Sequence, residues 1–185
     1  MPETVIADTK ASMEKTTNDL RKEYQKIRTG RANTALLDDV CVEYYGTPSS
    51  LSQVATLAVP EPRTITITPW EAKMIGPIEK AILNANLGLT PGNDGKLIRL
   101  TLPMLTEERR KEIVKGLKKM SEDHKVAVRN IRRKAIDDLK KLEKDKAVTE
   151  DELKKHEKEI QSITDNYISK LDEICLNKEK EVMEI

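Results

Sequence analysis

The residues that break regular helices are concentrated in one stretch of this chain, and this constrains the fold more than any other feature. Seven of the eight prolines and six of the seven glycines lie in residues 30–104. The flanks contain only Pro2 and Gly116 of these two types. Proline and glycine are unfavourable inside helices, so long helices are permitted on both sides of the stretch and not within it. The sequence therefore predicts helical flanks around a separate compact unit.

Apolar periodicity supports helices in both flanks. Residues 4–28 carry apolar side chains at spacings of three, four and seven, and Gly30 ends the pattern. Thr106 is the expected N-cap of a second helix of about 38 residues. Thr149 and Glu152 form a capping-box pattern that opens a last helix. Each helix has one apolar stripe that it cannot bury alone, so we expect the three to pack as a bundle.

The middle of the chain has strand periodicity around one short helix. We expect strands over residues 39–45, 51–59, 64–68 and 97–102, and a helix over 71–84. Residues 46–48 and 91–95 are interpreted as turn and loop. The predicted class is α+β, with residues 1–30 and 105–185 forming the bundle and residues 31–104 an inserted domain. The chain crosses between the two near Gly30-Arg31 and near Pro103-Met104, which we expect to act as a hinge.

The overall net charge of +1 conceals a strong asymmetry. Residues 109–134 contain 11 Lys or Arg and 3 acids, a local net of +8, whereas residues 143–185 have a local net of −5. A basic block in a nearly neutral chain indicates an anionic partner at one end.

The basic residues of the second helix are predicted to share one face. With Ile131 taken as the core direction and about 100° per residue, most of them fall roughly 100–200° away. These are Lys111, Lys115, Lys118, Lys125, Arg129, Arg132 and Arg133. Like charges at such spacing repel, a cost that an anionic ligand would relieve, and arginine suits phosphate. The alternative is a solvated face neutralised by acids on neighbouring helices. The pattern alone does not separate RNA from DNA or from an acidic protein.

Residues for catalysis or metal binding are missing from the sequence. There is no glycine-rich phosphate loop, and the two histidines have no nucleophile or acid arranged with them. His124 is interpreted as a boundary or core residue, His156 as a surface residue and Trp70 as a packing residue of the insert. Cys41 and Cys175 match no metal or redox spacing and are expected to be buried thiols. We therefore expect no enzyme, no cofactor and no metal.

No membrane or secretion signal is recognisable in the sequence. No apolar run approaches the roughly 20 residues that span a bilayer. The first residues do not have the charged-then-apolar pattern of a leader, so a cytoplasmic protein is expected.

Four stretches, in order along the chain, resemble the ribosome recycling factor family. They are KIRTGRA at 26–32, VEYYGTP at 42–48, LTEERRK at 105–111 and VAVRNIRR at 126–133. The resemblance covers the whole chain, with no departure from the motifs. It implies an L-shaped, two-domain molecule in which an elongated antiparallel three-helix bundle carries a small β/α/β domain.

The resemblance also implies a function. Members of the family bind the ribosome after termination, while it still holds mRNA and deacylated tRNA, and with elongation factor G and GTP split it into subunits. The bundle would dock on large-subunit ribosomal RNA, and elongation factor G would push on the insert. A monomer without catalytic residues or small-molecule substrate is expected.

Particular residues can be given roles on this basis. Arg129, Arg132, Arg133 and Lys125 are expected to contact ribosomal RNA, with Arg132 foremost. Arg28 and Arg31 would extend that contact near the hinge. The competing hypothesis is a helical coiled-coil adaptor or holdase chaperone that presents its insert to client proteins; it explains the long charged helices but not the clustered arginines or the four stretches.

Overall fold

The computed structural model describes residues 1–184, which pack as two units. One unit combines Met1–Tyr24 with Lys111–Met183, and the other is Gln25–Arg110. Among these residues no helix is long and apolar enough to cross a membrane. The predicted α+β class, a helical bundle with a small inserted β-domain, is confirmed. The predicted domain boundaries at residues 31 and 104 stay a prediction.

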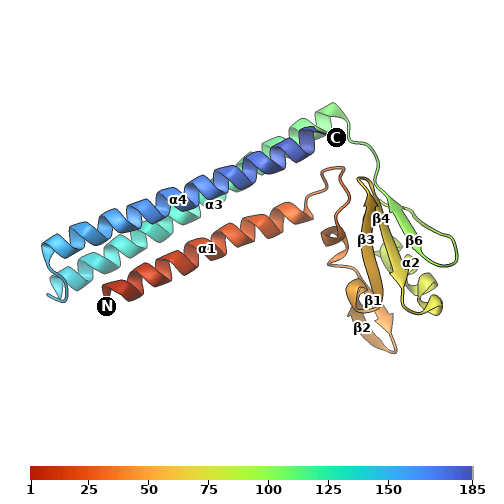
Figure 1. The fold of residues 1–185 in the computed structure, drawn as a ribbon, viewed down its shortest axis with the longest axis horizontal. Helices are drawn as coiled ribbons and strands as arrows, with labels where there is room; N and C mark the ends of the chain where they lie inside the picture. Colours follow the sequence, from red (N-terminus) through yellow and green to blue (C-terminus); the bar gives the residue numbers. More distant parts are fainter. Residues whose placement is uncertain (185) are drawn as a thin grey trace. The chain divides into compact units, whose positions relative to one another are not determined.

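The first unit is built from three long helices, which run side by side (Figure 1). They are α1 (Pro2–Lys26), α3 (Glu107–Lys144) and α4 (Glu150–Met183). Each buries one stripe of mainly aliphatic side chains, such as Leu20, Leu139 and Leu171, all fully enclosed. Because the stripes recur at helical spacing, each helix removes its apolar face from water only against the other two.

Contacts between the helices establish that α3 is antiparallel to both of its neighbours. Towards α4, Lys118 pairs with Glu179 and Lys125 with Asp172, so the numbers fall on one helix as they rise on the other. Towards α1, the Tyr24 hydroxyl donates to the Leu117 carbonyl oxygen at 2.7 Å, while Thr9 lies with Ala135 at the other end of α1, and Figure 1 shows the two helices running in opposite directions. The antiparallel order follows from the short connection between α3 and α4.

Both predicted helix caps are present. The Arg109 amide donates to Thr106 Oγ1 at 3.2 Å. At the start of α4, the Thr149 amide donates to Glu152 Oε2 at 2.9 Å and the Glu152 amide returns a bond to Thr149 Oγ1 at 3.3 Å. These bonds satisfy amides that have no partner within the helix.

The second unit contains a hairpin and a four-stranded antiparallel sheet. The hairpin joins β1 (Cys41–Tyr44) to β2 (Thr47–Ser50). The sheet has the order β3-β4-β6-β5. Its strands are β3 (Ala55–Glu61), β4 (Thr64–Pro69), β5 (Pro91–Asn93) and β6 (Ile98–Thr101). There are also three short 3-10 helices: η1 (Thr34–Leu37) before β1, η2 (Leu51–Gln53) between β2 and β3, and η3 (Ala72–Met74) after β4.

The core of this unit lies between the sheet and α2 (Ile75–Asn84), which covers one sheet face (Figure 1). Ile65, Ile67, Ile98 and Leu100 point to it from the sheet, and Ile78 comes from α2; all five are fully buried. Alternate residues of β4 and β6 face away from α2, which explains the alternation of isoleucine with threonine along β4.

Two short strands were not predicted. β2 occupies part of the expected turn, because the turn itself is Tyr45-Gly46, with φ values of 49° and 77°. Such left-handed values at both central residues are those of a tight two-residue hairpin. β5 lies in the expected loop at 91–95, where pairing with β6 overrides the proline and glycine signals.

Candidate nucleic-acid interface

The buried face of α3 differs from the one predicted. Its most enclosed side chains are Leu117, Ser121, Val128, Ala135 and Leu139. At about 100° per residue around the helix axis, the mean direction of these five side chains is roughly 60° away from Ile131. The direction of the core predicted from the sequence was that of Ile131. The reason is that α3 has two neighbours: α1 approaches on the Ile131 side and α4 on the side of Lys125. The prediction that the basic strip lies opposite the core was therefore wrong for the residues beside α4.

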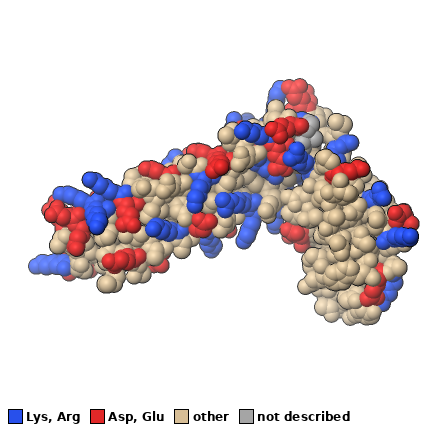
Figure 2. Space-filling model, in the orientation of Figure 1, with Lys and Arg blue, Asp and Glu red and all other residues tan. Residues whose placement is uncertain are grey.

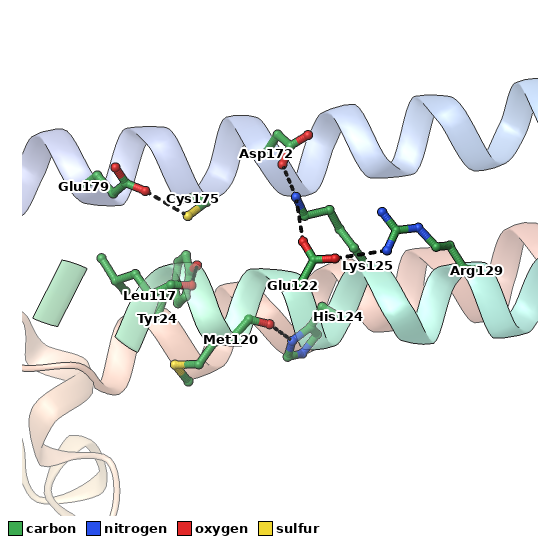
Figure 3. Close-up of polar contacts among 10 residues, drawn as sticks. All are labelled: Tyr24, Leu117, Met120, Glu122, His124, Lys125, Arg129, Asp172, Cys175 and Glu179. Carbon is green, nitrogen blue, oxygen red and sulfur yellow. Dashed lines mark hydrogen bonds and ion pairs between the residues drawn. The ribbon is translucent and has the colours of Figure 1, made fainter. Parts of the chain in front are cut away.

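Lys125 and Arg129 lie along the α3–α4 seam and are held by carboxylates (Figure 3). Lys125 Nζ is 2.7 Å from Asp172 Oδ1 on α4 and 3.2 Å from Glu122 Oε2. Arg129 Nη1 is 3.0 Å from Glu122 Oε1. Two cations and two carboxylates thus form one compensated network. The solvation alternative expects such pairing, and the part of Lys125 and Arg129 in RNA contact stays a prediction.

The pKa values in this network are shifted as the pairing requires. Hydrogen bonds from Arg129 and Lys125 hold the pKa of Glu122 below its ordinary value. A hydrogen bond to Asp172 raises the pKa of Lys125, since it favours the charged ammonium. Both Glu122 and Asp172 are more than half exposed, so solvent screens their ion pairs with the two cations.

Neither Arg132 nor Arg133 is paired with an acid in the described chain. Arg132 Nη1 donates to the neutral amide oxygen Gln161 Oε1 of α4 at 3.0 Å. The Arg133 side chain is exposed and, within residues 1–184, has no hydrogen-bond or ion-pair partner. These two arginines therefore keep their positive charge available to an external anion. The bundle surface in Figure 2 shows the wider setting, with Lys and Arg interspersed among Asp and Glu.

The other predicted RNA contacts and the predicted hinge belong to the second unit, Gln25–Arg110. Arg28 and Arg31 are exposed there. Gly30 is buried with φ 81°, a backbone conformation that favours glycine, and Met104 is 69% exposed. The part played by these residues and by Pro103 in RNA contact or hinge motion stays a prediction.

A largely buried polar cluster of Tyr24, Cys175 and Glu179 lies in the bundle beside the network of Lys125 and Glu122 (Figure 3). Tyr24 is 3% exposed, and burial, together with the neighbouring Cys175, raises its pKa well above 10. Burial also raises the pKa of the Cys175 thiol, which donates to Glu179 Oε1 at 3.3 Å. A thiol in this state is mainly protonated at neutral pH and therefore a poor nucleophile.

Three interpretations of single residues need correction. Cys41 is exposed, because it alternates with buried Val42 on β1. Trp70 is 66% exposed and donates through Nε1 to Thr56 Oγ1 at 3.1 Å, so it is not a core residue of the insert. The His156 side chain is only 16% exposed and its Nδ1 is buried, so it is not a free surface residue.

Two further findings concern His124 and metal binding. His124 is half-buried at the α1–α3 boundary, as predicted, with Nδ1 2.8 Å from the Met120 carbonyl oxygen. Within residues 1–184, no group of three or more His, Cys, Asp or Glu could hold a metal ion.

The sequence interpretation missed the partners of the basic residues. Glu122 could have been found, because it lies three residues before Lys125 and seven before Arg129, both helical spacings. Asp172 and Gln161 carried no signal of this kind, since they are far away in sequence and meet α3 only in the folded bundle.

Comparison with known proteins adds to this geometry. A family model described as ribosome recycling factor matches residues 20–183. The chain is 80% identical over its full 185 residues to the ribosome-recycling factor of Trichlorobacter lovleyi, and 69% identical to that of Geobacter sulfurreducens. In both cases the match covers all of both chains.

Solved structures show the same likeness. A solution structure of a ribosome recycling factor superposes with a TM-score of 0.79 at 38% identity, covering 100% of this chain and 98% of that one. A second structure has a TM-score of 0.69 at 44% identity, with 98% of each chain covered. It is described as models for the T. thermophilus ribosome recycling factor and E. coli elongation factor G bound to the E. coli post-termination complex.

Proposed function

The chain belongs to the ribosome recycling factor family, and we propose that it acts as a translation factor on ribosomes that have completed termination. With elongation factor G and GTP, it splits these ribosomes into subunits and frees them from mRNA for reuse. The observation that carries this proposal is similarity along the entire chain, to relatives of the same length and to a factor placed on a post-termination complex.

The bundle is the arm that docks on the ribosome. Ribosomal RNA is an array of phosphates, and Arg132 and Arg133 offer charge that no acid of the described chain pairs directly. Arg129 and Lys125 join the contact by exchanging their ion pairs with exposed carboxylates for phosphate. Few aromatics are available for base stacking, so the contacts are to the backbone of folded RNA.

The second unit serves as the part on which elongation factor G acts. In this proposal, Arg28 and Arg31 extend the RNA contact, and Gly30, Arg31, Pro103 and Met104 form the connection that lets the insert move. The factor binds the ribosome and transmits the movement of elongation factor G to it. GTP hydrolysis by elongation factor G supplies the free energy for splitting.

A ribosome-splitting assay tests this function. Post-termination ribosomes are incubated with the protein, elongation factor G and GTP, and whole ribosomes are separated from subunits on a density gradient. We expect loss of whole ribosomes only when all three components are present. Whole ribosomes that persist, together with suppressed aggregation of an unfolded client protein, would favour the adaptor or holdase instead.

An Arg132→Glu variant sharpens the same assay. Arg132 is on the surface of α3, so its replacement is expected to leave the helical circular dichroism unchanged. Reversal of its charge is expected to abolish binding to large subunits and splitting. Undiminished binding by a folded variant would remove Arg132 from the interface.

A further inference from the structure

We propose that Gln161 is a positioning residue for Arg132: it holds the guanidinium in place for a phosphate without neutralising it, and Asp165 fixes the orientation of Gln161. The inference rests on the proposed function, in which Arg132 contacts ribosomal RNA. It adds two residues of α4 to an interface that the sequence assigned to α3 and the chain near Gly30.

The orientation of the Gln161 amide is dictated by its two neighbours. Its Nε2 donates to Asp165 Oδ1 at 2.8 Å, one helical turn along α4, and its Oε1 accepts from Arg132 Nη1 at 3.0 Å. A carboxylate only accepts and a guanidinium only donates, so the amide fits between them in one orientation. In the flipped orientation, Nε2 of Gln161 would face the Arg132 guanidinium, so that two donors meet. Oε1 would face the Asp165 carboxylate, so that two acceptors meet.

This arrangement restrains Arg132 before any ligand binds. A long arginine side chain loses rotamer freedom when it is immobilised on a partner, and that loss weakens binding. The bond to Gln161 uses one of five N–H donors, so the remaining donors stay available for phosphate oxygens. The restraint therefore favours binding without blocking it.

The neighbouring cations show why a neutral partner matters. Arg129 and Lys125 are held by the carboxylates of Glu122 and Asp172, which an incoming phosphate must displace. Within the described chain, Arg132 forms no direct ion pair. The nearest carboxylate in this arrangement, Asp165, bonds to Gln161, and the neutral Gln161 amide bonds to Arg132. A carboxylate in place of the amide would compensate the charge that the RNA contact uses.

Two substitutions of Gln161 separate positioning from charge. Binding to purified large ribosomal subunits is measured at several salt concentrations, with circular dichroism to confirm folding. Gln161→Ala keeps the charge and loses the restraint, so we expect about three- to tenfold weaker binding with an unchanged salt slope. Gln161→Glu pairs with Arg132, so we expect weaker binding and a slope that is shallower by up to about 0.9, the contribution of one duplex phosphate.

Asn177→Glu provides the matched control. It makes the same change of charge at an exposed position of the same helix, far along α4 from Arg132. We expect its affinity and salt slope to remain near those of the unmodified protein. An equal effect of Gln161→Glu and Asn177→Glu would mean that overall charge, and not the pairing with Arg132, is responsible, and would overturn the proposal.

A double-mutant cycle then decides whether Gln161 acts through Arg132. In an Arg132→Ala background, Gln161→Ala is expected to cause no further loss of affinity. An equal loss in both backgrounds, with the unmodified protein binding normally, would overturn this inference and leave the proposed function intact. Absence of binding by the unmodified protein would overturn the proposed function and this inference together.

Discussion

At the scale of single residues, the state of each basic side chain depends on its partner. Lys125 and Arg129 are compensated by acids, Arg132 is held by a neutral amide, and Arg133 is exposed. All four look equivalent in the sequence, as cations of one helix. Their contributions to binding are therefore expected to differ, with Arg132 and Arg133 contributing more per residue than the two that must first leave a carboxylate.

Tyr24 offers a test of the bundle interior. Its hydroxyl bonds to the Leu117 carbonyl oxygen inside the bundle, so Tyr24→Phe is expected to lower the free energy of unfolding by about 1 kcal/mol at pH 7. Burial raises the pKa of the folded phenol above its ordinary 10.0, so the unfolded chain loses this proton first. The stability that Tyr24 adds is thus complete below pH 10 and declines above it.

The measurement is urea unfolding of both proteins at neutral pH and near pH 10.5. Other titrating groups are common to the two chains, so their effects cancel in the difference. We expect the advantage of tyrosine over phenylalanine to shrink at the higher pH. A difference that is independent of pH would contradict the buried, neutral state of Tyr24.

At the scale of elements, helix ends follow local chemistry closely. The capping box at Thr149 and Glu152 starts α4 immediately after the break that separates it from α3. Thr149→Ala removes the hydroxyl that accepts from the Glu152 amide. It is expected to lower the free energy of unfolding by about 1 kcal/mol while leaving most of the helical circular dichroism intact.

Ser162→Ala is the control for this prediction, since Ser162 is an exposed hydroxyl residue in the interior of α4 with no capping role. Its replacement by a better helix former should be neutral or slightly stabilising. If Thr149→Ala were no more destabilising than Ser162→Ala, the cap would have no measurable part in defining α4.

At the scale of the whole molecule, the distribution of charge matters more than its sum. The chain carries a net +1, so attraction to RNA must come from a local surface. Binding to large subunits is expected to weaken steeply with salt, because each neutralised phosphate releases counterions. A flat salt dependence would indicate an interface dominated by protein.

Two substitutions with the same change of net charge test whether RNA binding depends on the charge of α3 or on the charge of the whole molecule. Arg133→Gln lies on α3 and Lys96→Gln lies in the second unit, and both positions are exposed. We expect Arg133→Gln to lower the affinity and reduce the salt slope by about 0.7 to 0.9, and Lys96→Gln to change neither appreciably. Equal effects would mean that the molecule responds to total charge.

The sequence by itself determined the order of the long helices, their caps and the family. Helix starts such as Thr106 and Thr149 were predictable because caps act over three or four residues. The long helices were predictable because a stripe of apolar residues repeats many times. The short strands β2 and β5 were not, since three or four residues carry little periodicity and pairing with a neighbouring strand decides them.

Only the tertiary structure decided which face of α3 is buried and which cations are compensated. Two helices pack on α3, so its buried face lies between the directions of the two neighbours. The sequence of α3 alone does not specify this direction. The partners of Arg132 and Lys125 come from α4, 29 and 47 residues further along the chain. Such pairings depend on how two helices align after the turn that joins them, and this alignment is set by packing across the bundle.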